Sequence, residues 1–399
     1  MYPKLSDMIN DLFGTNINLP IQSYGFFVAL AFLLAGYLLY LELKRKEKKG
    51  LIIPQQKTRI IGRPASVYDL VISFVIAFFI GLKFIGAVFN YSHFADQPQQ
   101  FIFSWEGSWI GALLMGAASS FYTWWKKNRQ KLDKPKTIKE TVHSYEQTGA
   151  IVLVAAIAGI VGAKIFHQFE NWDDFIADPL GSLFSFSGLT FYGGLIVAAF
   201  AVAYYAEKNN IRWLHIADSV APSLILAYGV GRIGCQVSGD GDWGIVNTTP
   251  RPDWLSWLPD WAWAYDYPHN VLKQGIPIEG CTGEYCYRLA EPVFPTPIYE
   301  TTMCILIFVF LWSIRKKLPY AGMLFSIYLI LNGIERFLIE KIRVNTEYQI
   351  FDMRITQAEI ISLILFILGI IGIFYTRKHG RKVKLKREKD ELSTDQHTT

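Results

Sequence analysis

The chain has 399 residues, 51% of them hydrophobic, and its formal net charge is +5. The apolar residues gather in long runs between short charged connectors. A helix of about 20 apolar residues is long enough to cross the hydrocarbon core of a membrane. The sequence therefore predicts an integral membrane protein and argues against a nucleic-acid-binding protein. The four cysteines form no metal-ligand cluster, so no metal or cofactor is expected.

Nine membrane-spanning helices are predicted from the apolar runs. They cover about 20–43, 69–91, 108–125, 149–167, 189–206, 217–235, 296–314, 321–342 and 358–376. The first run is too long for a signal peptide and has no basic segment before it, so we expect it to remain as the first span. Lysine and arginine gather in alternate connectors, at 44–63, 126–139, 315–317 and 377–389. The positive-inside rule then puts the C-terminus in the cytoplasm and the N-terminus outside.

The predicted spans divide this all-α polytopic protein into six segments. Residues 1–63 hold the first span and a cytoplasmic basic loop, 64–148 an extra two-span hairpin, 149–235 core spans, 236–295 an outer cap domain, 296–376 further core spans, and 377–399 a basic cytoplasmic tail. The hairpin is interpreted as an internal duplicate, because Gly81 and Lys83 recur 81 residues later as Gly162 and Lys164.

The predicted cap contains five of the twelve tryptophans. Tryptophan prefers the headgroup level of a membrane, so the cap either lies on the membrane surface or has a small core of its own. Its two cysteines, Cys281 and Cys286, can form a local disulfide in an oxidising compartment.

Six ionisable side chains interrupt or border five of the apolar runs. They are Lys83, Lys164, Arg232, Glu300, Arg336 and Glu340. A charge at the bilayer centre costs about 3 kcal/mol or more, so it marks a functional site by default. All six fall toward the outer leaflet, and the inner half is expected to be nearly bare of charge. This distribution favours an outer-leaflet lipid site over a transporter path.

The eighth predicted span carries a polar stripe in the segment LNGIERFLIEKIR. Asn332, Arg336, Glu340 and Arg343 are spaced by four, four and three residues, which places them on one helical face. Either Arg336 and Glu340 form an internal ion pair that locks helices together, or one arginine is left over to hold an anion. Arginine suits phosphate because its planar guanidinium donates two parallel hydrogen bonds.

Further candidates lie at the outer ends of other spans. In YGVGRIGCQVSGDGDWG, Arg232 stands among glycines and is followed by Asp240 and Asp242, a composition that suits a phosphate cradle or tight helix packing. Glu300, in FPTPIYE, either orients an arginine or favours its helix N-terminus. Tyr192, before two glycines, is typical of an interfacial anchor.

Taken in order, these segments resemble the bacterial phosphatidylglycerol–prolipoprotein diacylglyceryl transferases. The similar segments are GRIG at Gly231–Gly234 continuing to Trp243-Gly244, PTPIYE at Pro295–Glu300, RFLIEKIR at Arg336–Arg343, GGL at Gly193–Leu195, GAK at Gly162–Lys164, SYG at Ser23–Gly25, and Gln357. The resemblance covers about 20–43 and 149–376. It implies a seven-span core to which the hairpin 64–148 has been added.

The chain departs from the family pattern at five positions. The family usually has His at Tyr192, Asn at Cys235, Tyr at Asn332, His at Phe294 and Arg at Lys164. The first change matters most, because that His is a candidate general base and a tyrosine with a pKa near 10 is a poor base at neutral pH.

The resemblance implies an enzyme of the bacterial plasma membrane that moves a diacylglyceryl group from phosphatidylglycerol to the lipobox cysteine of a prolipoprotein. It implies that Arg232 and Arg336 bind the phosphate, that Glu300 and Glu340 hold them, and that Arg343 meets the headgroup at the surface. Asp240, Asp242 or Tyr192 would accept the thiol proton. The substrate-contact residues that it implies are Tyr24, Lys164, Gly193, Gly194, Gly231, Gly234, Gly239, Gly244 and Asn332.

Two other functions stay open at this point. One is a transporter or channel with intramembrane charges. The other is a non-catalytic lipid- or lipoprotein-binding relative, for which the change at Tyr192 is the argument.

Overall fold

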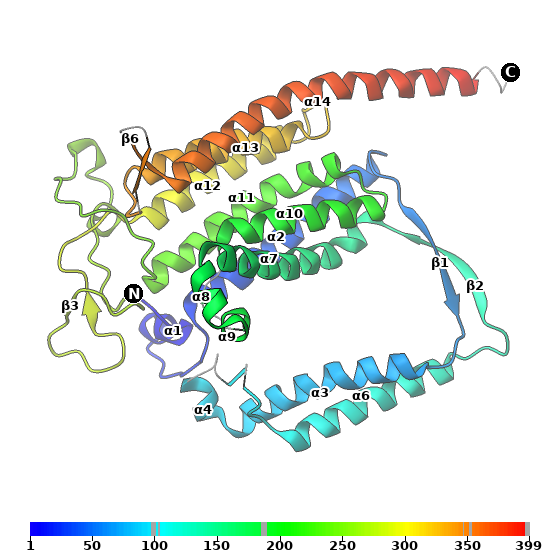
Figure 1. The fold of residues 1–399 in the computed structure, drawn as a ribbon, viewed down its shortest axis with the longest axis horizontal. Coiled ribbons are helices and arrows are strands. Elements are labelled where there is room, and N and C mark those ends of the chain that lie inside the picture. Colours follow the sequence, from blue (N-terminus) through cyan, green and yellow to red (C-terminus); the bar gives the residue numbers. More distant parts are fainter. Residues whose placement is uncertain (97–100, 103, 185–189, 346, 351–352, 396–399) are drawn as a thin grey trace. The chain divides into compact units, whose positions relative to one another are not determined.

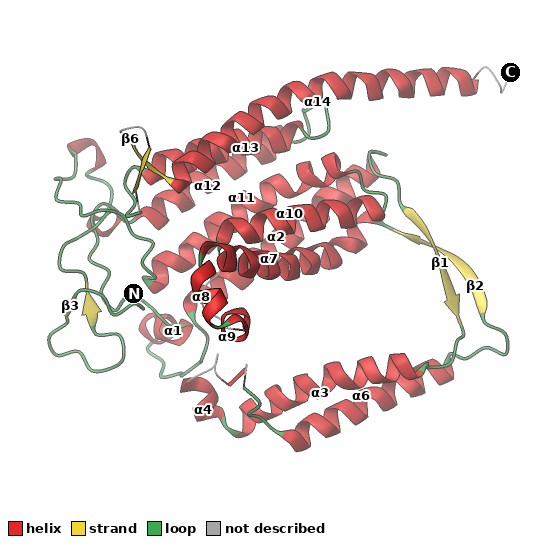
Figure 2. Ribbon diagram, in the orientation of Figure 1, coloured by secondary structure: helices red, strands yellow, loops and turns green. Residues whose placement is uncertain are grey.

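The computed structural model describes residues 1–96, 101–102, 104–184, 190–345, 347–350 and 353–395. The described chain is mainly helical, with three two-stranded sheets (Figure 2). Its contacts divide it into two compact units. One comprises Met1, Ser23–Gln55 and His143–Thr399, and the other comprises Tyr2–Gln22 and Gln56–Val142.

The first unit is a bundle of long helices that run in roughly the same direction (Figure 1). They are α2 (Ser23–Lys48), α7 (Thr148–Glu170), α10 (Phe191–Lys208), α11 (Trp213–Ser238), α12 (Thr296–Ile314), α13 (Met323–Glu340) and α14 (Gln357–Asp395). Three short helices complete this part of the unit, namely η1 (Ser144–Gln147), α8 (Trp172–Ala177) and α9 (Pro179–Phe184).

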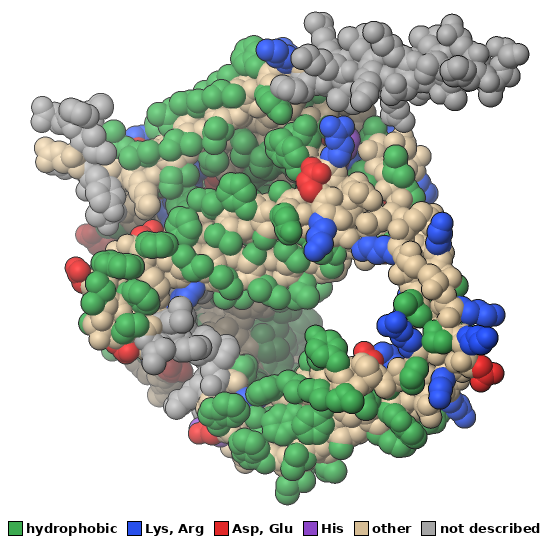
Figure 3. All heavy atoms as spheres, turned by 45° about the vertical axis from the view of Figure 1, so that its right-hand side comes forward, with side chains coloured by type: hydrophobic (Ala, Val, Ile, Leu, Met, Phe, Trp, Pro, Cys, Tyr) green, Lys and Arg blue, Asp and Glu red, His purple; other side chains and the backbone are tan. Residues whose placement is uncertain are grey.

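The helices have the length and surface of a membrane protein. Within the described residues, six stretches are both long and apolar enough to cross a bilayer: Ser23–Lys48, Val67–Phe89, Ser144–Glu170, Trp213–Ser238, Thr296–Ile314 and Gln357–Lys378. Three further helices of the expected set, α6 (Trp109–Arg129), α10 and α13, fall outside these six. Hydrophobic side chains cover much of the visible helical surface (Figure 3), and Phe200 is 75% exposed. The chain is a helical, polytopic membrane protein.

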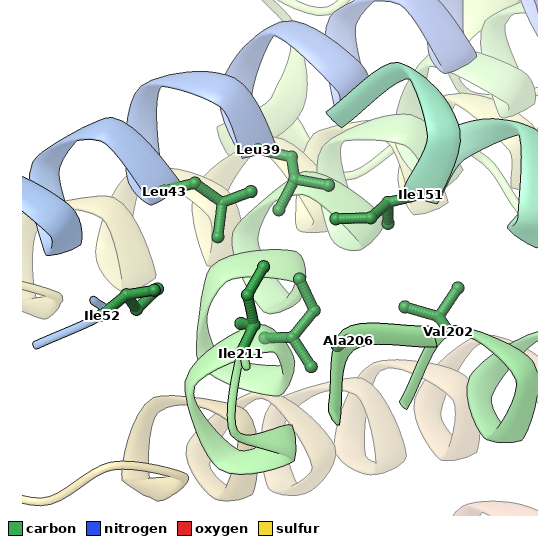
Figure 4. Packing of buried hydrophobic residues seen from close by; sticks show 8 residues of the cluster. Leu39, Leu43, Ile52, Ile151, Val202, Ala206 and Ile211 are labelled. Carbon is green, nitrogen blue, oxygen red and sulfur yellow. The ribbon is translucent and has the colours of Figure 1, made fainter. Parts of the chain in front are cut away.

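Two clusters of buried residues hold the bundle together. In the first, Leu39 and Leu43 lie one turn apart on α2 and pack against Ile151 of α7 and Val202 of α10 (Figure 4). In the second, α11, α12 and α13 meet around Ala221, Ile225, Cys304, Leu311, Leu324 and Tyr328. The second cluster fixes the three helices that carry most of the polar residues described below.

The hairpin of the second unit shares some backbone contacts with a hairpin of the first. It consists of α3 (Val67–Phe89), α4 (Tyr91–Asp96) and α6, and its counterpart consists of α7, α8 and α10. The N–H of Asn90 donates to the Gly86 carbonyl at 2.9 Å, and the N–H of Asn171 donates to the His167 carbonyl at 3.0 Å. These paired contacts are 81 residues apart, like the matches in the sequence.

The second helix of each hairpin is joined to the first by a further matched pair of contacts. The N–H of Ser108 donates to the Leu82 carbonyl at 2.9 Å, and the N–H of Thr190 donates to the Ala163 carbonyl at 3.1 Å. A Cβ added to Gly162 would lie 2.6 Å from the Gly193 carbonyl oxygen, so only glycine allows this approach.

Lys83 has a structural role inside the second unit. Its ammonium donates to the carbonyls of Phe101, Ser104 and Glu106 at 2.6, 2.5 and 2.7 Å. An ammonium has three N–H donors, and all three are used. The prediction that Lys83 belongs to the polar functional site is wrong, because the side chain holds its own loop.

The expected connectors contain strands that the charge pattern did not predict. β1 (Gln55–Ile61) pairs with β2 (Lys136–Val142), so two basic connectors form a sheet. β5 (Glu347–Ile350) pairs antiparallel with β6 (Met353–Thr356) just before α14. The N-terminal α1 (Leu5–Phe13) was not predicted either.

The segment between α11 and α12 has a small core of its own. Trp243, Tyr267 and Val293 are buried together. The segment contains two 3-10 turns, η2 (Asp253–Leu255) and η3 (Asp260–Ala262), and the antiparallel pair β3 (Ile276–Pro277) and β4 (Tyr287–Arg288). A disulfide joins Cys281 and Cys286, as the spacing allowed. Three other tryptophans, Trp254, Trp257 and Trp261, are exposed by 75, 74 and 51%.

A group of buried charged side chains lies near the C-terminal end of α2 and the N-terminal end of α11. Glu42, Lys46 and Asp218 are 1, 4 and 7% exposed. Lys46 donates to the His215 carbonyl at 2.7 Å, and Glu42 pairs with Arg315 at 3.3 Å. The prediction that the inner half of the membrane is nearly bare of charge stays a prediction. These side chains all have protein partners, which gives them a structural role.

Candidate functional site

Three arginines and a glutamate meet where α11 ends, α12 begins and α13 ends. Glu300 is completely buried on the first turns of α12. Its carboxylate pairs with the Nε of Arg232, accepts a 2.9 Å hydrogen bond from Arg343 and lies 3.6 Å from the guanidinium of Arg336. Glu300 therefore pairs with all three arginines.

Tyr228 completes the arrangement around Arg232. The two residues lie one turn apart on α11, and Arg232 donates to the Tyr228 hydroxyl at 3.1 Å. That hydroxyl donates to Glu300 at 3.0 Å. The sequence analysis did not select Tyr228, although its spacing from Arg232 was a usable signal.

Asp242 is a second carboxylate that pairs with these arginines. It pairs with Arg232 through one oxygen and with Arg343 through the other. Gly239 ends α11 in the left-handed conformation, with φ 65°, and this turn brings the aspartates back toward the helix end. Although burial opposes the effect, Arg232 and Arg343 lower the pKa of Asp242.

Asp240 has the opposite electrostatic setting. One of its carboxylate oxygens accepts a hydrogen bond from the Asp242 N–H at 3.3 Å. Burial, and then the negative charge of Asp242, raise the pKa of Asp240. Of the two aspartates, Asp240 is thus the better proton acceptor, because a higher pKa means a stronger base.

Arg336 differs from Arg232 in the donors that it leaves unused. It pairs with Glu340 at 3.1 Å on the next turn of α13. Its Nε and Nη1 atoms are buried and have no hydrogen-bond partner among the described residues, and the same is true of Arg343 Nε. Arg232 engages all three of its nitrogens. The sequence offered two alternatives, an ion pair with Glu340 or an arginine with N–H groups left over for an anion. Arg336 has both the ion pair and N–H groups without a hydrogen-bond partner in the part of the chain that the structure describes.

Arg343 reaches the cluster by a turn and not along the helical stripe. α13 ends at Glu340, and the Ile245 N–H then donates to the Ile342 carbonyl at 2.9 Å. The Arg343 side chain is only 9% exposed. Glu300 and Asp242 hold this side chain, and the contact of Arg343 with a headgroup stays a prediction.

Two predicted tyrosines also face the cluster. Tyr192, in the first turn of α10, lies close enough to Arg336 to interact with it electrostatically. Tyr24, in the first turn of α2, interacts in the same way with Arg232 and Asp240 and is 47% exposed. Both residues are therefore brought to the arginines from helices outside the α11–α13 core.

The other predicted contact residues have different environments. Gly193 and Gly194 pack against α7, and Gly244 packs against the Ile342 carbonyl, so these glycines serve close backbone contacts. Gly234 lies against Phe27 and Tyr24, whereas a Cβ added at Gly231 would meet nothing within 4 Å. Lys164 is buried on α7, and Asn332 is half-buried on α13.

Glu335 is a member of the cluster that the sequence analysis missed. It is 2% exposed, and neither carboxylate oxygen has a hydrogen-bond partner within the described part of the chain. The signal was a second charge beside Arg336 in an apolar run. It was passed over because it does not fit the stripe of Asn332, Arg336 and Glu340.

Cys235, Asp240 and Asp242 offer ligand atoms that lie within 4.8 Å of one another. A cation there would face Arg232 and Arg343, which already pair with Asp242. Because like charges repel at this distance, we assign no metal to the group.

Comparison with known proteins gives a consistent family. The family model for prolipoprotein diacylglyceryl transferase matches residues 120–375. Proteins named phosphatidylglycerol–prolipoprotein diacylglyceryl transferase are similar to the chain. One from Oceanobacillus iheyensis is 31% identical over 57% of this chain and 72% of its own length. Another from Vibrio campbellii is 30% identical over 68% of this chain and 87% of its own length. A third, from Leptospira interrogans, is 28% identical over 53% of this chain and 66% of its own length.

Proposed function

Because the chain belongs to the prolipoprotein diacylglyceryl transferase family, we propose that it transfers the diacylglyceryl group of phosphatidylglycerol to the thiol of a prolipoprotein's lipobox cysteine. The observation that carries the proposal is the set of three arginines around Glu300, in which Arg336 keeps buried N–H donors without hydrogen-bond partners among the described residues. A phosphodiester supplies the acceptors that these donors need.

The reaction replaces one bond at the carbon of the diacylglycerol that bears the phosphate. The cysteine sulfur attacks this carbon, a C–S bond forms, and the C–O bond to the phosphate breaks. The bonding electrons leave with the oxygen of glycerol 1-phosphate. The thiol proton passes to a base in the site, since the thiolate is the stronger nucleophile.

The arginines stabilise the charge that grows on the departing phosphate. We assign direct contact with the phosphate to Arg336, whose Nε and Nη1 have no hydrogen-bond partner among the described residues. Arg232 and Arg343 add positive charge near Arg336. Asp242, Glu300 and Glu340 keep the guanidinium groups in place through ion pairs. Fixed charges aimed at a developing anion are a major source of rate enhancement.

Asp240 is our choice for the base that accepts the thiol proton. Burial and the charge of Asp242 raise its pKa, whereas Arg232 and Arg343 lower that of Asp242. Tyr192 lies beside Arg336 on the other side of the cluster. We assign it to contact with the lipid phosphate, with the partly exposed Tyr24 and the half-buried Asn332 at the edges of the site.

The donor enters sideways from the outer leaflet in this proposal. The N-terminus lies outside, the C-terminus lies in the cytoplasm, and α6, α10 and α13 complete nine spans. Residues 236–295 form a cap on the outer face, where exposed Trp254 and Trp257 meet the headgroups. Hairpin 64–148 is a duplicate of the α7–α10 hairpin.

Complementation separates this function from a non-catalytic one. The chain is expressed in bacteria depleted of their own transferase, and lipid attachment to a reporter prolipoprotein is followed by mass spectrometry. We expect modified reporter with the natural chain and none with Arg336→Ala. A chain that reaches the membrane but leaves the reporter unmodified would point to a lipid-binding relative. Ion or solute flux in proteoliposomes without lipid transfer would point to the transporter.

A further inference from the structure

Glu335 is an acidic residue that the arginine cluster does not need as a counter-ion. Asp242, Glu300 and Glu340 already pair with Arg232, Arg336 and Arg343, one acidic group for each arginine. Glu335 is 2% exposed, and both of its oxygens lack a hydrogen-bond partner among the described residues. A buried polar group without a partner is unfavourable, so its presence indicates a missing ligand atom.

The surroundings of Glu335 place it inside the same site. The charged and titratable groups near it are Tyr228 and Arg232 of α11, Glu300 and Cys304 of α12, Tyr328 and Arg336 of α13, and Arg343. It is therefore reached by the same three helices that hold the arginines, and it is the neighbour of Arg336 in the chain.

The unpartnered buried atoms of this site are of two kinds. Arg336 and Arg343 offer N–H donors, which need an anionic acceptor, and Glu335 offers two oxygens, which need donors. A ligand that satisfies both kinds carries a negative charge and hydroxyl groups a few bonds away. A phosphate ester of glycerol has this pattern, because its two free hydroxyls lie on the two carbons that follow the esterified carbon.

We propose that Glu335 accepts hydrogen bonds from the glycerol hydroxyls of the lipid headgroup and so makes the site selective for a phosphoglycerol. This inference rests on the proposed function and adds the contact by which the site recognises the headgroup. A lipid without headgroup hydroxyls leaves the Glu335 oxygens unpaired in the complex, and sites built to bond a hydroxyl discriminate strongly against analogues that lack it.

The test compares two donor lipids of equal charge with the purified full-length chain. Phosphatidylglycerol carries both hydroxyls, whereas phosphatidylethanol has the same phosphodiester and no hydroxyl. Transfer of the labelled diacylglyceryl group to a lipobox peptide is measured as kcat/KM for each. We expect the natural chain to prefer phosphatidylglycerol by about 10- to 100-fold, because a lipid without hydroxyls leaves a buried hydrogen-bonding group unsatisfied. Glu335→Leu should bring the ratio close to one, and Glu335→Gln, which keeps one acceptor, should give an intermediate ratio.

Asp218→Asn is the matched control, because Asp218 is a buried acidic residue at the opposite end of α11. It should leave the lipid ratio unchanged even if it lowers stability. A natural-chain ratio near one would overturn the inference without any variant, which matters if Glu335→Leu fails to fold. An unchanged ratio in Glu335→Gln and Glu335→Leu would also overturn it, while transfer itself would uphold the proposed function. A natural chain that transfers neither lipid would overturn both.

Discussion

Glu300 shows how one carboxylate can organise three guanidinium groups in an apolar environment. Its oxygens meet Arg232, Arg336 and Arg343, and its only other partner in the described structure is the Tyr228 hydroxyl. Removing one member of a buried ion pair leaves an uncompensated charge, which costs about 3–5 kcal/mol. The arginines therefore hold their positions before the phosphate arrives.

Replacing Arg336 tests the direct grip on phosphate. Arg336→Ala should lower kcat/KM for lipid transfer by about 100-fold or more, the usual effect of losing an oxyanion donor. Arg336→Lys keeps the charge but loses the planar fork, so it should retain only part of the activity. Arg288→Ala, at a 51% exposed arginine of the connector, is the control and should behave like the natural chain. Equal activity of Arg336→Ala and Arg288→Ala would remove Arg336 from the mechanism.

The pH profile tests Asp240 as the base. Its raised pKa means that the carboxyl stays protonated, and so inactive as a base, up to a higher pH than an ordinary aspartic acid. Activity should therefore fall as the pH decreases through that raised pKa and recover above it. Asp240→Asn should remove most of the activity and this acidic limb. Asp253→Asn, at an exposed position of the same connector, should keep the limb. A limb that persists in residual Asp240→Asn activity would assign it to another group.

At the scale of elements, α13 is held by a cap that comes from another helix. It begins after Gly322, which has φ 87° and no side chain to accept the first N–H groups. Asp218 of α11 accepts from the Gly322 and Phe325 N–H groups at 2.7 and 3.0 Å. The helix that carries Glu335 and Arg336 is thus fixed at its far end by α11, which carries Arg232.

Asp218→Ala should destabilise the protein by about 1–2 kcal/mol, the typical value of a helix cap. Thermal unfolding in detergent measures this effect. Ser313→Ala, on an exposed side chain of α12, is the control. The two variants should unfold at different temperatures. Identical midpoints would show that the Asp218 contacts do not stabilise α13.

The close contact of α7 and α10 should tolerate no side chain at Gly162. Gly162→Ala places a Cβ 2.5 Å from the Val197 Cβ and should separate the helices, displacing Tyr192 and lowering transfer. Gly149→Ala lies on the same helix, and its new Cβ meets nothing within 4 Å, so it should have no effect on activity. The thermal stability and the lipid-transfer activity of both variants are measured and compared. Full activity of Gly162→Ala would contradict this packing.

The sequence predicted the helices well because apolar runs of membrane length leave few alternatives. It could not predict the pairing of β1 with β2, because basic connectors look like loops by charge alone. It selected Arg232, Glu300, Arg336 and Glu340 from their positions in apolar runs, and the structure brings these side chains together. It could not predict how Arg343 reaches them, since a helical stripe gives no information about the turn that follows Glu340.

Over the whole molecule, buried charge lies at both ends of the first unit, and the two groups differ in how they are satisfied. Glu42, Lys46 and Asp218 all have protein partners. At the other end, Glu335, Arg336 and Arg343 keep buried atoms without hydrogen-bond partners in the described structure. This difference is our reason for treating the first group as structural and the second as the proposed binding site; the sequence could not separate them, because both consist of the same residue types.

The most direct test of this account is a transfer assay with the purified chain in defined lipid. Phosphatidylglycerol labelled in its diacylglyceryl group is supplied with a lipobox peptide, and the products are identified by mass spectrometry. We predict a thioether-linked diacylglyceryl group on the peptide cysteine, an equal amount of released glycerol phosphate, and no product when the cysteine is replaced by serine. Folded protein that binds the lipid but never labels the peptide would contradict the account.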